Sequence, residues 1–140
     1  MTPIAYSIFQ TEDYDEAAAF WQRTPYIGLS SADKCEAISI FLARNPGFSF
    51  TARDGDTLVG TVLLGHDGRR GYMYHLAVAA EYRGQGIARE LIRLGLEALR
   101  GAGIEKCHLF VYTDNQNALE FYRHEGWQQR EELVIFSMNV

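Results

Sequence analysis

The feature that most constrains this chain is a passage from a strand-like aromatic run into an amphipathic helix through two glycines. The run 72–78 is followed closely by Arg83-Gly84-Gln85-Gly86-Ile87-Ala88, and helical periodicity starts at Ile87. A strand that enters a helix through glycines leaves the first helical amides without partners, at the positive end of the helix dipole. We therefore expect the amides of residues 84–88 and the guanidinium of Arg83 to bind an anion, with a phosphorylated cofactor as the expected occupant.

Composition and charge limit what the chain can be. The 140 residues, 47% of them hydrophobic, suffice for one core, so we expect a single domain over residues 1–140. A net charge of −5 with interspersed signs offers no basic face to nucleic acid or to an anionic membrane surface. The two cysteines, Cys35 and Cys107, lack metal-ligand spacing. We expect both to be buried, reduced thiols, with no disulfide and no metal site.

The start of the chain gives no sign of a targeting segment. Residues 1–4 contain no basic stretch followed by an apolar one. No apolar run approaches the roughly 18 to 20 residues that span a bilayer. We therefore expect a soluble, cytoplasmic protein.

Hydrophobic periodicity predicts a mixed succession of helices and strands. Alternation and β-branched content predict strands at residues 4–9, 48–52, 58–64, 72–78, 106–112 and 133–138. Apolar residues three and four apart predict helices at residues 13–23, 30–44, 87–100 and 115–125. The predicted helix caps are Asp13 with Glu16, Ser30, and either Thr113 or Asn115. The segments 48–52, 58–64 and 72–78 should form an antiparallel meander, and 106–112 should run parallel to 72–78.

Three interpretations compete for the glycine turn. A nucleotide P-loop would need Gly-Lys-Ser/Thr at its end, and neither the lysine nor the hydroxyl is present. A Rossmann fingerprint would need a small residue where Arg89 stands, and it would follow the first strand of the fold. It would also need an acidic residue about 20 positions later. A glycine turn that merely joins a strand to a helix is the third interpretation. The order of the surrounding segments favours a cofactor site over this last one.

In this context the chain resembles the GCN5-related N-acetyltransferase (GNAT) family, in the order of its elements across nearly the whole chain. The family's pyrophosphate motif, Arg/Gln-x-x-Gly-x-Gly/Ala, is matched by Arg83, Gly86 and Ala88. Its second signature, Asn-x-x-Ala-x-x-x-Tyr followed by a Gly-aromatic step, is matched by Asn115, Ala118, Tyr122, Gly126 and Trp127. The resemblance implies an α/β fold of GNAT type, with a mixed, mostly antiparallel sheet of about six to seven strands flanked by about four helices.

The resemblance also implies a cofactor and its contacts. Acetyl-CoA would be the cosubstrate, with its pyrophosphate beside Arg83 on the amides of Gly84, Gln85, Gly86, Ile87 and Ala88. Ala77 and Val78 would hydrogen-bond the pantetheine arm as an added strand would. Asn115 would position pantetheine or adenine-side groups, and the same residue could cap the last helix. The implied reaction is acetyl transfer to a primary amine by direct attack in a ternary complex, with no metal.

Two residues are the main candidates for proton transfer. By resemblance, Tyr122 protonates the departing thiolate, although its place one turn beyond Ala118 also suits an aromatic at the edge of the core. An ammonium acceptor must lose a proton before attack, and a histidine side chain suits this step near neutral pH, so His75, on the strand before the glycine turn, is a candidate base. A lone histidine on an apolar strand is more often a core residue. Further candidate bases are His66, Glu81 and Glu36, and water could replace any single residue.

The acceptor is less constrained by the sequence. A small-molecule amine, an amino acid or a peptide N-terminus would each fit. Tyr26 and a turn containing Arg69 and Arg70 are candidate contacts, although a charged turn is usually only solvated. A homodimer is compatible with the resemblance, since dimers are common in the family. The alternative function is a catalytically silent module that binds acyl-CoA as a sensor or interaction partner.

Overall fold

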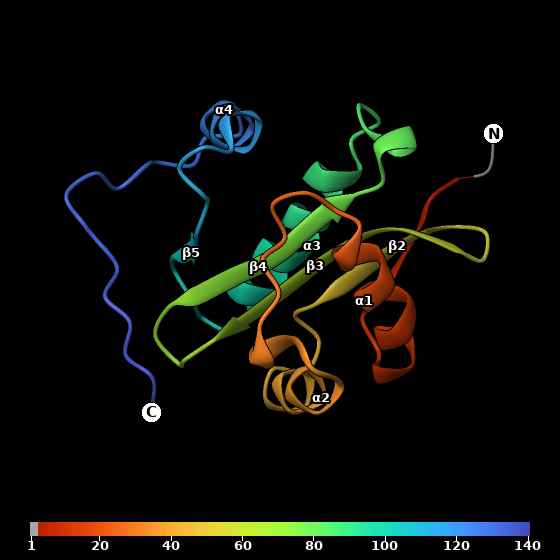
Figure 1. The fold of residues 1–140 in the computed structure, drawn as a ribbon, viewed down its shortest axis with the longest axis horizontal. Helices are drawn as coiled ribbons and strands as arrows, with labels where there is room; N and C mark the ends of the chain where they lie inside the picture. Colours follow the sequence, from red (N-terminus) through yellow and green to blue (C-terminus); the bar gives the residue numbers. More distant parts are fainter. Residues whose placement is uncertain (1–2) are drawn as a thin grey trace. The chain divides into compact units, whose positions relative to one another are not determined.

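The described chain, residues 3–140 of a computed structural model, contains one sheet whose five strands follow chain order (Figure 1). The strands are β1 (Ala5–Ile8), β2 (Phe50–Asp54), β3 (Thr57–His66), β4 (Gly71–Val78) and β5 (Cys107–Leu109). Pairing is antiparallel from β1 to β4 and parallel between β4 and β5. The expected meander and the expected parallel pairing are therefore confirmed.

Two kinds of helix connect the strands. The α-helices are α1 (Tyr14–Gln22), α2 (Cys35–Arg44), α3 (Ile87–Gly101) and α4 (Gln116–His124), which confirms the expected four. The short 3₁₀ turns are η1 (Thr11–Asp13), η2 (Ser31–Asp33) and η3 (Ala80–Tyr82). No helix among residues 3–140 is long and apolar enough to cross a membrane. Met1 and Thr2, part of the segment inspected for targeting signals, lie outside the described residues.

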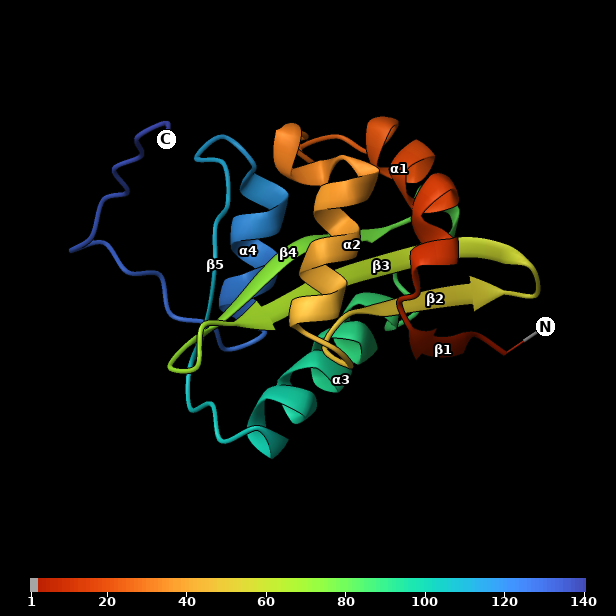
Figure 2. The ribbon, with the colours of Figure 1, turned by 90° about the horizontal axis from the view of Figure 1, so that it is seen from below.

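The chain divides into a compact unit of residues 1–110 and a second unit of residues 111–140, and each is described by itself. In the first unit, α1 and α2 cover one face of the sheet and α3 covers the other (Figure 2). Because β3 lies between these layers, its residues 58–65 are all buried. Trp21 of α1 and Leu63 of β3 belong to the core beneath α1 and α2.

A glycine in α3 sets how closely this helix approaches the sheet. A Cβ at Gly95 would lie 2.6 Å from Cδ1 of Leu64, so only a residue without a side chain fits. The most buried side chains of α3 are Ile87, Leu91, Ile92 and Leu99. Leu94 and Ala98, on the flanks of this face, are only partly buried.

Both 3₁₀ turns that precede α1 and α2 carry reciprocal caps. In η1 the Gln10 backbone amide donates to Asp13 Oδ2 at 2.8 Å. In η2 the Ser30 backbone amide donates to Asp33 Oδ2 at 2.9 Å. Ser30 therefore caps η2 rather than the helix itself, and α2 begins at Cys35. Each turn thus fixes one aspartate carboxylate through the backbone.

The expected capping pair of Asp13 with Glu16 is wrong. The Glu16 carboxylate instead accepts from the Leu58 amide at 3.1 Å and from the Arg53 guanidinium at 2.9 Å. The same guanidinium is 2.8 Å from Asp13 Oδ1. Glu16 binds these distant groups instead of capping the helix locally, because β2 and β3 bring a cation and an amide to the start of α1. These contacts tie α1 to the sheet.

The unit of residues 111–140 is organised around α4. Asn115 is its N-cap, and Asn115 Oδ1 accepts from the Ala118 amide at 3.2 Å. This confirms Asn115 rather than Thr113 as the cap. Gly126, just after the helix, has a φ of 94°, as a residue that ends a helix in the left-handed region often does.

The expected number of six to seven strands is wrong, since the sheet of the described chain has five. No residue between 3 and 140 pairs with the segment 133–138 as a strand, and Val134 and Phe136 are 77% and 93% exposed. Alternating apolar residues express a propensity, and a strand needs a neighbour to complete its hydrogen bonds. β5 is also shorter than expected, because it ends at Leu109 rather than at residue 112.

Candidate active site

The turn between β4 and α3 is kept open by its two glycines. Gly84 and Gly86 have φ angles of 77° and 82°, and a Cβ built at either would meet nothing within 4 Å. Gly86 is the N-cap of α3 and supplies no side-chain cap to the first helical turn. Since the first amides of a helix have no intrahelical acceptor and lie at its positive end, this turn can bind an anion.

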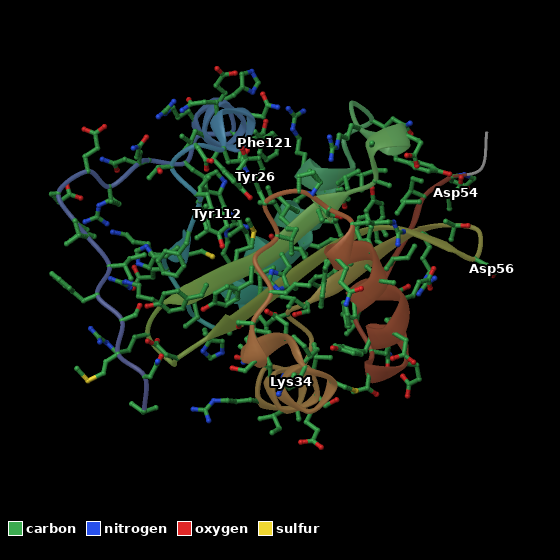
Figure 3. The ribbon with its side chains drawn as sticks, in the orientation of Figure 1. Tyr26, Lys34, Asp54, Asp56, Tyr112 and Phe121 are labelled. Atoms are coloured by element: carbon green, nitrogen blue, oxygen red, sulfur yellow. The ribbon has the colours of Figure 1, made fainter. Side chains whose placement is uncertain are left out.

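Contacts on the β4 side hold this turn in place. The Tyr82 hydroxyl of η3 donates to the carboxylate of Asp54, the last residue of β2 (Figure 3). The Ala79 amide donates to the carbonyl oxygen of β3 residue Val59 at 2.8 Å. Arg83 Nε donates to the Val78 carbonyl oxygen at 3.3 Å. These bonds connect η3 and the exposed Arg83 to the ends of β2, β3 and β4.

β4 has an edge without a strand partner next to this turn. Its ladder with β5 covers residues 71–73, whereas its ladder with β3 continues to Val78. In the described sheet, residues 74–78 therefore pair with a strand on one side only. Backbone groups on such an edge can pair with an extended ligand as an added strand would. Ala77 and Val78 lie on this stretch.

A β-bulge distorts the middle of β4. The register with β3 shifts between Thr61 and Leu63, and His75 has a φ of 50°. A non-glycine residue in this left-handed region is uncommon and is held there by its surroundings. The Thr61 hydroxyl donates to the His75 carbonyl oxygen at 2.9 Å. The same hydroxyl oxygen accepts from Trp21 Nε1 at 2.9 Å, so a buried polar chain supports the bulge.

The His75 side chain packs between a carboxylate and an aromatic ring. Its Nε2 lies 2.6 Å from Asp33 Oδ1, in η2. Its ring centroid lies 4.7 Å from that of Trp21, in an edge arrangement. Side-chain exposures of 13% for His75 and 12% for Asp33 place the pair largely out of solvent. The pair therefore links the bulge of β4 to the turn that precedes α2.

A cavity of about 190 Å³ is lined by Asp33 of this pair, but not by His75. Its walls come from α1 and from residues 29–34, and they include Trp21, Asp33 and Lys34. Lys34 lies at the start of α2 (Figure 3). The volume is smaller than that of pockets for drug-sized ligands, so the cavity suits a small substituent.

Two expected residues, Tyr122 and Asn115, belong to α4 in the second unit. The Tyr122 ring contacts those of Phe121 and Trp127, with centroids 5.2 and 5.8 Å apart. Burial raises the pKa of Tyr122 above its ordinary value of 10.0, because an apolar surrounding disfavours the phenolate. The hydroxyl therefore stays protonated at neutral and mildly alkaline pH. Asn115 acts as the helix cap already described, and its contact with a cofactor stays a prediction.

The expected site residues thus fall into two groups. In the first unit, His75, Ala77, Val78 and the turn 83–88 follow one another along the end of β4 and the start of α3. In the second unit, Asn115 caps the start of α4 and Tyr122 lies within the helix, near its end. The cofactor and catalytic roles of all these residues stay predictions.

The charged turn after β3 has an ordinary structural explanation. Asp67 Oδ1 accepts from the backbone amides of Arg69 and Arg70, each at 2.8 Å. These bonds hold the pKa of Asp67 below its usual range, as backbone donors to a carboxylate do. His66 Nδ1 accepts from the Gly68 amide at 2.9 Å. The turn is therefore organised by its own acceptors.

The remaining candidate site residues are exposed. Glu36 and Glu81 are exposed, and Tyr26, with a φ of 66°, lies in the connection between α1 and η2 (Figure 3). The expectation of two buried thiols is wrong for Cys35, which is exposed because it starts α2 on the solvent side. Cys107 is half-buried, and burial raises its pKa to about 11.

Asp33 was not among the residues expected at the site. Its partner His75 is 42 positions away, so no local pattern connects them. The Ser30-x-x-Asp33 spacing was a usable signal, because an acidic residue three positions after a capping serine faces back toward the turn. That signal locates the carboxylate but not the side chain that it meets.

Comparisons with known proteins show the family and the fold of the chain. The profile described as the Acetyltransferase (GNAT) family matches residues 6–127. N-alpha-acetyltransferase 30 of Schizosaccharomyces pombe is 35% identical over 104 residues, which cover 71% of this chain and 69% of that protein. An acetyltransferase of Photorhabdus laumondii is 32% identical over 134 residues, covering 95% and 93%. The PaiA N-acetyltransferase of Thermoplasma acidophilum, solved in complex with coenzyme A, has the same fold, with a TM-score of 0.77 at 19% identity over 93% and 92% of the two chains. This chain belongs to the GNAT family of acetyltransferases.

Proposed function

We propose that this chain transfers an acetyl group from acetyl-CoA to a primary amine, acting as a single domain over residues 1–140. The observation that carries the proposal is the end of β4, where an edge without a strand partner leads into a glycine turn and the open amides of α3. That order suits a ligand with an extended arm followed by a pyrophosphate. Membership of an acetyltransferase family supports acetyl as the group transferred.

The proposed cofactor contacts follow the order of the chain. The amides of residues 84–88 would hold the pyrophosphate, with the Arg83 guanidinium beside them. Ala77 and Val78 would pair with the pantetheine arm along the edge of β4. Asn115 would contact pantetheine or adenine-side groups. The glycines fit this use, because the space in which a Cβ would stand is open at both of them.

Acetyl-CoA supplies the acetyl group as a thioester, which is activated toward an amine. His75 would take a proton from the acceptor ammonium, so that its nitrogen has a lone pair for attack. A nitrogen–carbon bond then forms and the carbon–sulfur bond breaks. The Tyr122 hydroxyl would donate a proton to the departing sulfur and regain one from the acceptor nitrogen through solvent. The products are the amide, the free thiol of CoA and one released proton.

The cavity beside Asp33 and Trp21 is the proposed entry for the acceptor amine. It is lined by α1 and by the segment before α2, and Asp33 and Trp21 of this lining also contact the His75 side chain. One relative carries the name N-alpha-acetyltransferase. Peptides with a free N-terminus therefore belong beside small amines among the acceptors to be tested.

Release of free CoA thiol from acetyl-CoA, measured across metabolite amines, amino acids and peptides, tests the proposal. We expect release that depends on the amine, with the acetylated product identified by mass spectrometry. CoA binding without acetylation of any acceptor would instead support a catalytically silent acyl-CoA-binding module.

After incubation with acetyl-CoA alone, the intact mass should show no acetyl group on Cys35 or Cys107. An adduct that forms at the catalytic rate would contradict direct transfer.

A further inference from the structure

Asp33 is fixed by its own turn before it meets His75. Its Oδ2 accepts from the Ser30 amide at 2.9 Å, and the Ser30 hydroxyl accepts from the Ala32 amide at 3.2 Å. The Tyr14 hydroxyl of α1 donates to the Asp33 carbonyl oxygen at 2.6 Å. With the backbone and one carboxylate oxygen already held, Oδ1 has a set position opposite the imidazole.

This carboxylate determines which imidazole nitrogen carries the hydrogen. An ionised carboxylate only accepts hydrogen bonds, and Oδ1 lies 2.6 Å from His75 Nε2. Nε2 must therefore be the donor, which leaves the lone pair of the neutral ring on Nδ1. We propose that Asp33 is a positioning residue that fixes His75 in the Nε2–H tautomer and so makes Nδ1 the nitrogen that takes the proton of the acceptor. The second half of this inference rests on the proposed function.

The other neighbours of His75 keep the ring in place. Trp21 contacts it edge-on, and the Thr61 hydroxyl binds its carbonyl oxygen at the bulge. The strained backbone angle is thus supported from α1 and β3 while Asp33 supports the ring from η2. A base held in this way needs no rotation before each proton transfer, which lowers the entropic part of the barrier. Asp33 and Trp21, which both contact the His75 ring, also line the cavity proposed as the entry for the amine.

The chain contains a matched control carboxylate in η1. Asp13 has the same place in its turn as Asp33, since its Oδ2 accepts from the Gln10 amide at 2.8 Å. Its Oδ1 is paired with the Arg53 guanidinium at 2.8 Å rather than with a histidine. Asp13→Asn and Asp33→Asn therefore remove the same charge from the same kind of turn, and only the second change touches His75.

Nitrogen-15 NMR of the histidine side chains reads the tautomer directly, and His75→Gln assigns the His75 signals. We expect the hydrogen on Nε2 in the wild type and in Asp13→Asn. Asp33→Asn should lose this single tautomer, because an amide donates as well as accepts. A wild-type hydrogen on Nδ1, or an unchanged His75 spectrum in Asp33→Asn, would overturn the proposal.

Kinetics with the amine found in the acceptor screen measure the consequence. We expect Asp33→Asn to lower kcat by about tenfold to a hundredfold with an unchanged KM for acetyl-CoA, and Asp13→Asn to keep kcat. Equal losses in the two variants would mean a merely structural role and would contradict the proposal.

Thermal melting checks that each variant folds. Asp33→Glu keeps a carboxylate, so it should retain the Nε2–H tautomer and recover part of kcat. If Asp33→Asn does not fold, Asp33→Ser gives the same test, since an unchanged Nε2–H signal without the carboxylate would overturn the proposal. If the wild type acetylates no amine, the proposed function fails, whereas the NMR result still decides whether Asp33 sets the tautomer.

Discussion

The Tyr122 hydroxyl is in the state that a proton donor needs, because burial raises its pKa above 10.0. We expect Tyr122→Phe to lower the rate of acetyl transfer by about tenfold to a thousandfold. The KM for acetyl-CoA should change little, since the remaining ring still packs against Phe121 and Trp127. The rate is measured in a single turnover, so that slow product release does not mask the chemistry.

Tyr6→Phe on β1 is the control for this change, because it removes a phenol hydroxyl far along the chain from the proposed donor. It should leave the single-turnover rate unchanged. The raised pKa of Tyr122 also means that ionisation of this residue should not reduce the rate below about pH 10. A wild-type rate in folded Tyr122→Phe would assign protonation of the thiolate to water or to another group.

At the scale of elements, two glycines with nearly equal backbone angles stand at opposite ends of α3. Gly86 has a φ of 82° and Gly103 a φ of 80°, and a Cβ at either would stand in open space. An alanine at either place costs a similar strain, about 1–2 kcal/mol. Only Gly86 stands at the N-terminus of α3, where the first amides of the helix are, so we expect a methyl group to obstruct an anion only there. We expect Gly86→Ala to weaken CoA binding by about tenfold or more, and Gly103→Ala to leave it unchanged.

Calorimetry with CoA measures both affinities, and thermal melting checks that the two variants lose similar stability. This comparison separates backbone strain from obstruction of the ligand. Equal CoA affinities in the two folded variants would contradict the proposal that the glycine turn binds the cofactor.

Elements with strong local signals could be predicted from the sequence, and contacts between distant elements could not. The cap at Asn115, the left-handed Gly126 and the strand–glycine–helix order are all expressed within a few residues. The bond from Trp21 to Thr61 spans 40 positions, and it exists only because α1 packs on β3. The Asp33–His75 pair depends on the same packing. The strand predicted at 133–138 is wrong although its local signal is strong. Its pattern is that of a strand, but no partner strand is present among residues 3–140.

Across the whole first unit, resistance to acid depends on the tie between α1 and the sheet. Burial alone would raise the pKa of Glu16, but hydrogen bonds from the Leu58 amide and the Arg53 guanidinium outweigh burial and hold it below 4.5. A carboxylate whose pKa is lowered by folding contributes stability above its unfolded pKa and loses it as the pH falls through the folded value. The free energy of unfolding should therefore decrease below about pH 4.5.

Glu16→Gln tests this dependence, with the exposed Glu36→Gln of α2 as the control. We expect Glu16→Gln to lower the free energy of unfolding at neutral pH by about 0.5–1 kcal/mol and to flatten its decrease in acid. Urea denaturation at neutral and acidic pH measures both effects. The Glu36→Gln variant should follow the wild type at each pH, and an equally steep acid dependence in Glu16→Gln would place the titrating groups elsewhere.

The uncharged segment 133–138 affects how readily the protein aggregates at high concentration. Its Phe136 side chain is 93% exposed, and the segment combines strand propensity with the absence of proline. Such stretches are where intermolecular β-sheets begin to grow when copies meet at high concentration. Glu131 and Glu132 stand directly before it, and their charges repel those of a neighbouring copy. The rate of aggregation in concentrated solution should therefore depend on two opposing effects, the repulsion between the glutamates and the β-propensity of the segment that follows them. Aggregation should become faster when salt screens the repulsion.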